Sequence, residues 1–510
     1  MRARANDTLV MFAIALGAFT LAAAAGLINL LGHGQYTVAL IALFAGIAIL
    51  ASMASLEIAL LCLCVLSFTD GMLKGLDPTG MSVFAKDLFL GLALVRWGWL
   101  NLVRGDWSSL RIPLVYPAVL FIVYCTAQVV NTTTLSSVVA LAGLRSWIVW
   151  IPVAFLAYYT IRHQWHVQWL LIVLLTLSVS TSIYGIVQYH IGFDHLFQLG
   201  SGFAFYNRFG WDEQTVRATS TFVSPGTFGA AMSLMVIIAL GALWYLQNWP
   251  GKALALLTAA AGVVGLGTSG SRAPLLAAAV GGVAMLLLVR RPRVVWTVAI
   301  VVLLGVLMVT TLASGAFARR YNLRMLNAPL IIHRIMLPFS RGFQSALDHP
   351  LGTGVATGVG LGRAANIVQE TEGNLEVAQE SWGMVENEYG RALRELGIPG
   401  ATLFIALLLT ALHGGLVACR KCRTTAFLTL AAASTGAMVC TLAQLTGGSA
   451  LYLAPGGSLF YLSYALAMRL PELEAVALNR QAEEATEQQA VAAGSRPVSR
   501  LYVRRLRHGL

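Results

Sequence analysis

The chain has 510 residues, of which 57% are hydrophobic and only 11% are charged. Because about a quarter of the residues in an ordinary soluble domain are charged, this composition excludes a soluble globular enzyme, as well as disordered and fibrous chains. Lys and Arg number 34 against 22 Asp and Glu, which gives a net charge of +12. Since basic residues collect on the cytoplasmic loops of any membrane protein, the informative arginines are those that fall elsewhere.

Apolar runs close to the ~20 residues that a helix needs to cross a bilayer recur along most of the chain. We therefore predict an all-α polytopic membrane protein, a bundle of about 12–14 transmembrane helices with a long periplasmic loop containing short helices. The third run is short and could be re-entrant. The predicted spans are 9–31, 36–53, 55–68, 86–103, 113–130, 137–160, 167–190, 222–246, 252–268, 272–289, 294–313, 397–419, 425–443 and 448–468.

Basic residues lie mainly on one side of these spans. With the N-terminus inside, the short outside connections hold only Lys74 and Arg272, and this asymmetry predicts that both termini are cytoplasmic. The basic residues of the inside connections are Arg2, Arg4, Arg104, Arg111, Arg162, Lys252, Arg290, Arg291, Arg293, Arg420, Lys421, Arg423 and Arg469.

The spans and the loops between them divide the chain into five parts. The longest outside loop is of a length that usually marks a binding or catalytic element, so we expect function on the outside. The Ala/Gln/Glu-rich tail after Pro471 is expected to be mobile, with its basic end on anionic lipid. The parts are N-terminal transmembrane helices (1–136), a transmembrane core with a periplasmic loop at 191–220 (137–313), the long periplasmic loop (314–396), C-terminal transmembrane helices (397–469) and a cytoplasmic tail (470–510).

Two arginines fall in outside segments beside helix starts. Arg217 lies in VRATSTFVSPGTFG, just before a span that opens with Ser, Pro and Gly, where a helix start would aim free N–H groups toward an anion. Arg272 occupies the tight turn SGSRA against the positive-inside preference, which indicates a carboxylate partner or an anionic ligand. Taken singly, Arg217 could instead be an interfacial anchor and Arg272 a helix-cap donor.

Three more arginines are candidates to bind the same anion. Arg334 and Arg341 lie on a predicted amphipathic stretch, HRIMLPFSRGFQSALDHPLGTGVATG, that runs into a glycine-rich turn. Arg334 taken singly could be a surface charge. Arg145 lies inside the sixth predicted span, where a guanidinium in hydrocarbon costs several kcal/mol unless it is paired.

The segment VENEYGRALRELGIPG is predicted to form a helix that leads into the next span, and it carries Glu386, Asn387 and Tyr389. Glu388 and Arg391 would be i,i+3 neighbours on this helix, and a solvated ion pair is the simplest interpretation of them. Because Glu386 has no basic residue four positions further on, it is the freer carboxylate.

We expect no metal and no cofactor, because no spacing of His, Cys and Asp resembles a metal site. The alternative is a divalent ion held by the acidic cluster of the long loop. That cluster consists of Glu370, Glu372, Glu376 and Glu380.

Five segments follow one another in a distinctive order: YGIVQYHIG at 184–192, RATSTFVSPGTFG at 217–229, SGSRA at 269–273, HPLGTGVATG at 349–358 and NEYGRALRELGIPG at 387–400. In this order, and with the long outside loop among them, they resemble the O-antigen ligase and polymerase family of bacterial membrane glycosyltransferases of the GT-C type. The resemblance covers roughly residues 140–420.

The resemblance implies a glycan donor linked to undecaprenyl diphosphate and an acceptor glycan, free or lipid-linked, whose hydroxyl receives the chain without nucleotide sugar. It implies the bacterial cytoplasmic (inner) membrane, a periplasmic active site, contact with membrane lipids and with other polysaccharide assembly proteins, and no nucleic acid. By their positions in the motifs, Arg217 and Arg272 would bind the diphosphate.

The chain departs from the family pattern at three places. The ligases carry a His before the Asn-x-Tyr of the last motif, and this position is Glu386 here. Ser220 stands for a usual Gly, and Ser224, Pro225 and Gly226 stand for Asn-Pro-Asn. These departures favour a polymerase of exopolysaccharide, capsule or O-antigen repeats over a lipopolysaccharide O-antigen ligase.

The chemistry of such a transfer agrees with these residue types. Arg forks bind phosphate oxygens bidentately and would stabilise the charge that develops on the leaving diphosphate. Glu386 would act as general base on the acceptor hydroxyl, and direct in-line inversion is the simplest route because no activated nucleophile is evident. The predicted substrate-binding set is Arg145, Arg217, Arg272, Arg334, Arg341, Asn387 and Tyr389.

Two other classes of function stay open. A secondary transporter or flippase for a lipid-linked or anionic glycan would show inverted repeats and broken spans. Neither is evident in the sequence, although Arg145 and Pro152 within one span keep this alternative open. A non-catalytic assembly scaffold is the third possibility.

Overall fold

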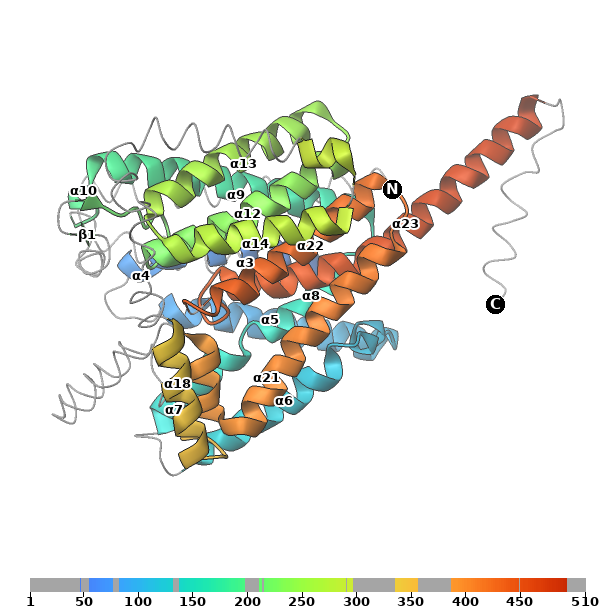
Figure 1. Cartoon of the computed structure of the whole chain (residues 1–510). Coiled ribbons are helices and arrows are strands. Elements are labelled where there is room, and N and C mark those ends of the chain that lie inside the picture. Colours follow the sequence, from blue (N-terminus) through green and yellow to red (C-terminus); the bar gives the residue numbers. More distant parts are fainter. Residues whose placement is uncertain are drawn as a thin grey trace.

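The computed structural model describes residues 46, 55–76, 82–131, 137–197, 211–212, 215–289, 291–296, 335–355, 387–448 and 450–492. Over these residues the protein is almost entirely helical, as predicted (Figure 1). Two short strands, β1 (Trp211–Asp212) and β2 (Thr215–Val216), pair as an antiparallel hairpin directly before Arg217.

Helices lie at the predicted spans wherever these spans fall in the described residues. The first half of the chain holds α3 (Leu56–Phe68), α4 (Asp70–Leu76), α5 (Ser82–Arg104), the 3-10 helices η1 (Ser108–Arg111) and η2 (Gln128–Val130), α6 (Val115–Ala127), α7 (Ser137–Ile148), α8 (Ile151–Thr160), α9 (Gln164–Ile191) and α10 (Asp194–Phe197). The second half holds α12 (Pro225–Tyr245), α13 (Trp249–Ser269), α14 (Arg272–Val289), α18 (Leu337–Asp348), α21 (Glu388–Lys421), α22 (Thr425–Gln444) and α23 (Gly456–Ala492).

Seven helices of the described chain are long and apolar enough to cross a membrane, which identifies a polytopic all-α membrane protein. Their lengths follow from the cost of exposing backbone polar groups to lipid, because a helix satisfies these groups within itself. The seven are Ala140–Thr160, Gln164–Ile191, Pro225–Tyr245, Trp249–Ser269, Arg272–Val289, Glu388–Lys421 and Thr425–Gln444. The spans predicted at 9–31, 36–53 and 294–313 lie wholly or largely outside the described residues.

Within the apolar segment Ala140–Thr160, α7 and α8 join at a short break at Val149 and Trp150. Pro152 stands in the first turn of α8, where its missing N–H is tolerated. In a continuous helix the same residue would remove a hydrogen bond and clash with the preceding turn. The break therefore follows from the proline, and it brings Arg145 near the end of a helix.

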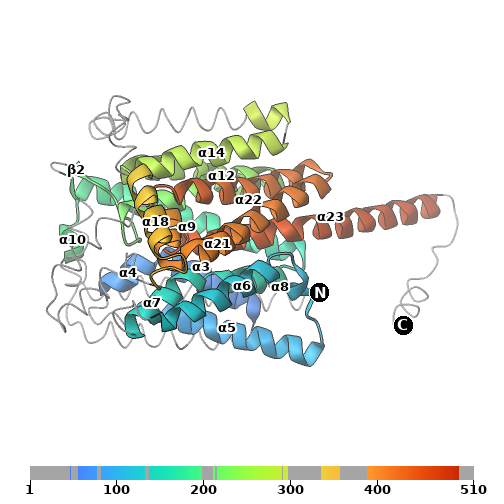
Figure 2. The ribbon, with the colours of Figure 1, turned by 60° about the horizontal axis from the view of Figure 1, so that its bottom comes forward.

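The last helix is longer than predicted. α23 continues through Pro471 to Ala492, so the prediction of a mobile tail that starts at Pro471 is wrong as far as Ala492. Low hydrophobicity suggested disorder, but Ala, Glu and Gln are strong helix formers and extend the helix beyond the bundle. Figures 1 and 2 show the C-terminal half of α23 projecting away from the other helices.

The core of the bundle is built from α12, α13, α14 and α22, with α9 packed against α13. α21 packs against α6, α18, α22 and α23. Figures 1 and 2 show α4, α7, α10, α18 and the β1–β2 hairpin at one end of the bundle, opposite the projecting part of α23. We call this the arginine end, because Arg217 and Arg272 lie there.

Candidate functional site

The segment after β2 and the turn between α13 and α14 meet at the arginine end. Arg217 donates from Nη2 to Ser271 Oγ at 3.0 Å and from Nε to the Ser269 carbonyl at 3.4 Å. Arg272 begins α14 directly after this turn. The structure therefore brings the Arg217 side chain to the turn that directly precedes Arg272, although α12 and α13 separate the two residues along the chain.

Gln188 of α9 holds the segment that follows Arg217. Its Oε1 accepts hydrogen bonds from the backbone N–H of Thr219 at 2.8 Å and of Ser220 at 2.7 Å, and the Gln188 side chain is fully buried. Ser220 has a φ of +52°, in the left-handed region that glycine adopts at least cost. The pattern that the motifs resemble has Gly at this position. In this chain the hydrogen bond from Ser220 N to the buried Gln188 amide stabilises a left-handed backbone conformation that is unfavourable for serine.

α4 packs directly on the same segment. The N–H groups of Gly71 and Met72 donate to the Thr221 carbonyl at 2.9 and 3.1 Å. A side chain at Gly71 would lie 2.2 Å from the carbonyl carbon of Phe222, so only glycine allows this approach. The N-terminal helices therefore contribute to the site through α4.

Asp70 of α4 holds two ammonium groups beside this contact. Lys74 Nζ lies 2.5 Å from Asp70 Oδ2, and Lys86 Nζ of α5 lies 2.6 Å from Asp70 Oδ1. Burial by itself would raise the pKa of Asp70, but the charges and hydrogen bonds of Lys86 and Lys74 lower it below its ordinary value. The carboxylate is therefore ionised, and the three-residue cluster carries net positive charge.

Arg145, near the end of α7, has the carboxylate partner expected for an arginine inside a span. It donates to Asp87 of α5 from both Nε and Nη2, the latter at 3.1 Å from Asp87 Oδ1. Both side chains are about one-fifth exposed. The pair ties α7 to α5 next to Lys86, and the predicted contact of Arg145 with substrate stays a prediction.

The start of α21 is fixed by the two polar residues predicted to bind substrate. Asn387 is the N-cap, with its Oδ1 accepting from Gly390 N at 3.0 Å and its Nδ2 donating to the Ile335 carbonyl at 3.2 Å. Tyr389 Oη donates to the Leu442 carbonyl at 3.1 Å. In the structure both side chains therefore position this helix.

A loop after α22 connects the start of α21 with the Arg272 turn. The N–H of Glu388 donates to the Leu445 carbonyl at 2.9 Å. Two residues further on, a methyl group at Gly447 would lie 3.4 Å from Cβ of Ala273, the residue after Arg272. The last motif of the resemblance and the SGSRA motif therefore lie on the same end of the bundle, one loop apart.

The interpretation of Glu388 and Arg391 as a solvated ion pair is wrong. Both residues are buried, and Glu388 accepts a hydrogen bond from Leu451 N at 3.2 Å. Arg391 pairs with Glu395, one helical turn further on, with Nε 2.9 Å from Oε1. The pairing differs because α21 packs against other helices at this point, so its charges must find partners away from water.

The Arg391–Glu395 pair also binds α7. Arg391 Nη2 donates to Ser146 Oγ at 2.6 Å, and Trp147 Nε1 donates to Glu395 Oε2 at 2.6 Å. The Arg391 guanidinium lies 4.4 Å from the centre of the Trp147 ring, within the range of a cation–π contact. Both charged groups of the pair are hydrogen-bonded, which offsets the free-energy cost of burying them away from water.

The glycine-rich turn after α18 packs on a kink of α21 at Gly397, which has a φ of +65°. The N–H of Thr353 donates to the Arg394 carbonyl at 3.0 Å, and the N–H of Ile398 donates to the Pro350 carbonyl at 2.9 Å. These bonds satisfy backbone groups that a kinked helix leaves free. Two motifs that are distant in sequence thus form one structural unit.

For the other predicted site residues, the described part of the chain shows no contact with Arg217 or Arg272. Arg341 is exposed on α18, whose next residue, Gly342, packs closely on Gly390 of α21. Glu386 and Arg334 lie outside the described residues, as does the acidic cluster proposed as a metal site.

The contacts close a loop of elements around the arginine end. α4 rests on the Arg217 segment, this segment contacts the Arg272 turn, and that turn meets the loop that holds the start of α21. α21 binds α7 through Arg391, and ion pairs then lead from α7 through α5 back to α4. Basic side chains recur around this loop, which suits it to a polyanion such as a diphosphate.

Sequence reasoning missed Lys86, Asp70 and Gln188. The adjacent charges of Lys86 and Asp87 at the start of an apolar run were a signal, since ionisable residues in spans are rare and mark functional regions. Gln188 is the polar residue in the apolar motif YGIVQYHIG. Their partners lie on other helices and are visible only in the fold.

Fold and site together define a polytopic helical membrane protein with a group of basic side chains at one end. Residues 257–405, from α13 to the middle of α21, match a protein-family model described as O-Antigen ligase. This match confirms, over the matched residues, the resemblance of the motifs to the O-antigen ligase and polymerase family. Arg272 lies within the matched residues and Arg217 precedes them. No curated protein matches the chain.

Proposed function

We propose that the protein is a glycosyltransferase that moves glycan from an undecaprenyl-diphosphate-linked donor to an acceptor hydroxyl, as a polymerase of glycan repeats or an O-antigen ligase. The family supports an enzyme of glycan transfer in polysaccharide biosynthesis. The single observation that carries the diphosphate assignment is the contact of Arg217 with the turn that begins α14 at Arg272. Guanidinium groups on two adjacent segments would suit the two phosphates of one diphosphate.

The arginine end is proposed to face the periplasm of a bacterial inner membrane. The opposite ends of the helices carry the basic residues Arg104, Arg162, Lys252 and Lys421, as the positive-inside preference requires of cytoplasmic loops. The lipid tail of the donor would then lie among the spans, with its diphosphate at their outer ends. Arg217 and Arg272 would stabilise the negative charge that develops as the sugar–phosphate bond breaks.

Glu386 is the proposed general base, in the place where the ligases of the family have His. As the acceptor oxygen attacks the anomeric carbon, its proton would pass to the Glu386 carboxylate. Glu386→Gln keeps the size of the side chain but removes the base, so the rate of transfer is expected to fall by about 100- to 10,000-fold with donor binding retained. Measured turnover of a purified variant at the wild-type level would assign the base to another residue.

The break between α7 and α8 is the observation that favours the second candidate, a flippase or transporter, because such proteins bind cargo at broken spans. Two ion pairs near this break, Arg145–Asp87 and Arg391–Glu395, argue against it, because their charged groups are already bound to each other and not open to a cargo. Among the described residues, no feature favours a scaffold without activity.

An experiment in reconstituted vesicles distinguishes glycan transfer from transport. Purified protein is reconstituted with a labelled polyprenyl-diphosphate glycan, and two readouts are followed in the same sample: new glycosidic linkages, and accessibility of the label on the other leaflet. The proposal expects longer glycans or a ligated product from donor supplied on the side of the arginine end. Movement of label without any new linkage would replace it with transport.

A further inference from the structure

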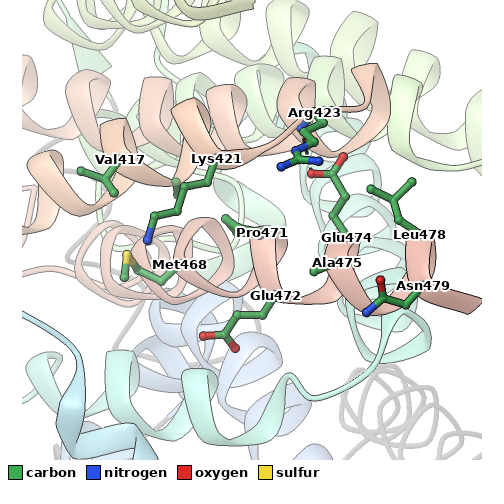
Figure 3. Close-up of a pocket in the computed structure, with 11 residues that line it drawn as sticks. Val417, Lys421, Arg423, Met468, Pro471, Glu472, Glu474, Ala475, Leu478 and Asn479 are labelled. Carbon is green, nitrogen blue, oxygen red and sulfur yellow. Dashed lines mark hydrogen bonds between the residues drawn. The ribbon is translucent and has the colours of Figure 1, made fainter.

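A second candidate site lies at the opposite end of the bundle, between the end of α21 and the cytoplasmic part of α23. A cavity of about 500 Å³ opens there (Figure 3). Its lining combines apolar side chains, Val417, Met468 and Leu478, with the basic side chains of Lys421 and Arg423. Since α21 ends at Lys421 and α22 begins at Thr425, the cavity lies at a boundary of the membrane.

The two acidic residues that line this cavity are both bound to other groups of the protein. Glu474 is buried and accepts hydrogen bonds from the N–H groups of Arg423 and Thr424 at 2.8 and 2.6 Å, so it caps the start of α22. Glu472 forms an ion pair with Arg469 and accepts from Tyr158 Oη at 2.8 Å. The Glu474 carboxylate therefore binds the backbone before α22, and the Glu472 carboxylate binds Arg469.

The two basic side chains are differently placed. Lys421 and Arg423 are exposed, and within the described part of the chain neither has a carboxylate oxygen within 4.0 Å of its nitrogens. Figure 3 shows Lys421 pointing from α21 toward Met468 on α23, with Arg423 at the other end of the cavity. The cavity thus places two basic side chains beside apolar ones, while its two carboxylates are bound to backbone N–H groups and to Arg469.

From this arrangement we infer that the cavity binds the headgroup of an anionic phospholipid from the leaflet opposite the arginine end. A phosphate anion would meet Lys421 and Arg423, and basic pockets between helices at the cytoplasmic surface are suited to such headgroups. The apolar floor of Val417, Met468 and Leu478 would contact the glycerol and the first methylenes, which an inorganic phosphate lacks. The site is separate from the proposed transfer site and does not depend on that function.

The test uses the full chain in detergent, titrated with phosphatidylglycerol, phosphatidylcholine or inorganic phosphate and followed by native mass spectrometry. We expect the wild type to retain phosphatidylglycerol in preference to phosphatidylcholine. Lys421→Gln and Arg423→Gln are each expected to weaken phosphatidylglycerol binding about 5-fold, and the double variant about 30-fold. Because both residues are exposed, we expect the variants to fold like the wild type. Their gel-filtration profiles test this.

Arg480→Gln is the matched control, because Arg480 is exposed on α23 outside the cavity. It should bind phosphatidylglycerol as the wild type does. Wild-type binding by the double variant, or an equal loss in Arg480→Gln, would overturn the assignment. Displacement of the lipid by millimolar inorganic phosphate would also overturn it, since the ligand would then be a phosphate ion.

Discussion

Replacing Arg272 or Arg217 with Ala is expected to lower the rate of glycan transfer by about 100- to 1,000-fold in each case, the usual cost of removing one donor from developing negative charge. In the proposed reaction the leaving diphosphate gains negative charge as the sugar–phosphate bond breaks, and the guanidinium groups would stabilise that charge. The measurement is the initial rate with a defined polyprenyl-diphosphate donor, together with donor binding.

Two further variants sharpen this expectation. Arg272→Lys keeps the charge but loses the fork that binds two oxygens, so its rate should lie between those of wild type and Arg272→Ala. Ser220→Gly lies in the Arg217 segment and suits the φ of +52° there, so it should retain activity and folding. If product from both Ala variants ran at the wild-type level on a gel, the diphosphate site would have to be sought elsewhere.

Arg391→Ala is expected to destabilise the protein by about 3–5 kcal/mol, because it leaves the buried carboxylate of Glu395 without its partner. Ser146 and Trp147 would lose part of their link to α21 as well. The loss is measured as the fraction of monodisperse protein that survives heating, or as a shift of the unfolding midpoint in denaturant.

The double variant Arg391→Met with Glu395→Leu removes both charges and should recover most of the lost stability, since apolar residues of similar volume can replace a buried ion pair. Arg420→Ala, on the exposed far end of the same helix, should change stability by less than about 0.5 kcal/mol. A double variant that is less stable than Arg391→Ala would mean that the two residues do not act as a pair.

Much of the site could be anticipated from the order of the motifs. Arg217 and Arg272 are predicted to share a ligand, and the fold places the Arg217 side chain against Ser271, the residue before Arg272; the shared ligand stays a prediction. The pairing of Arg391 was mispredicted because Glu388 and Glu395 both lie within one helical turn of it. Only the packing of α7 against this part of α21, with Ser146 and Trp147, selects Glu395.

The end of the last helix shows a different kind of error. A polar, Ala-rich stretch has too little apolar surface to form a core, and this suggested a mobile tail after Pro471. Helix formation, however, depends on backbone propensity and on the preceding span, which provides an already formed helix to extend. α23 therefore continues to Ala492, and its residues 479–489 are exposed to solvent.

Composition and apolar runs predict the class of the protein and, within the described residues, the positions of its helices, because lipid favours a helix for each apolar run of sufficient length. Its basic residues also predicted the orientation. How the polar side chains pair is visible only in the fold, where Gln188 binds the backbone of the Arg217 segment and Asp70 pairs with Lys86. The physical reason is that a buried charge or amide must find a partner, and that partner lies on whichever helix packs beside it.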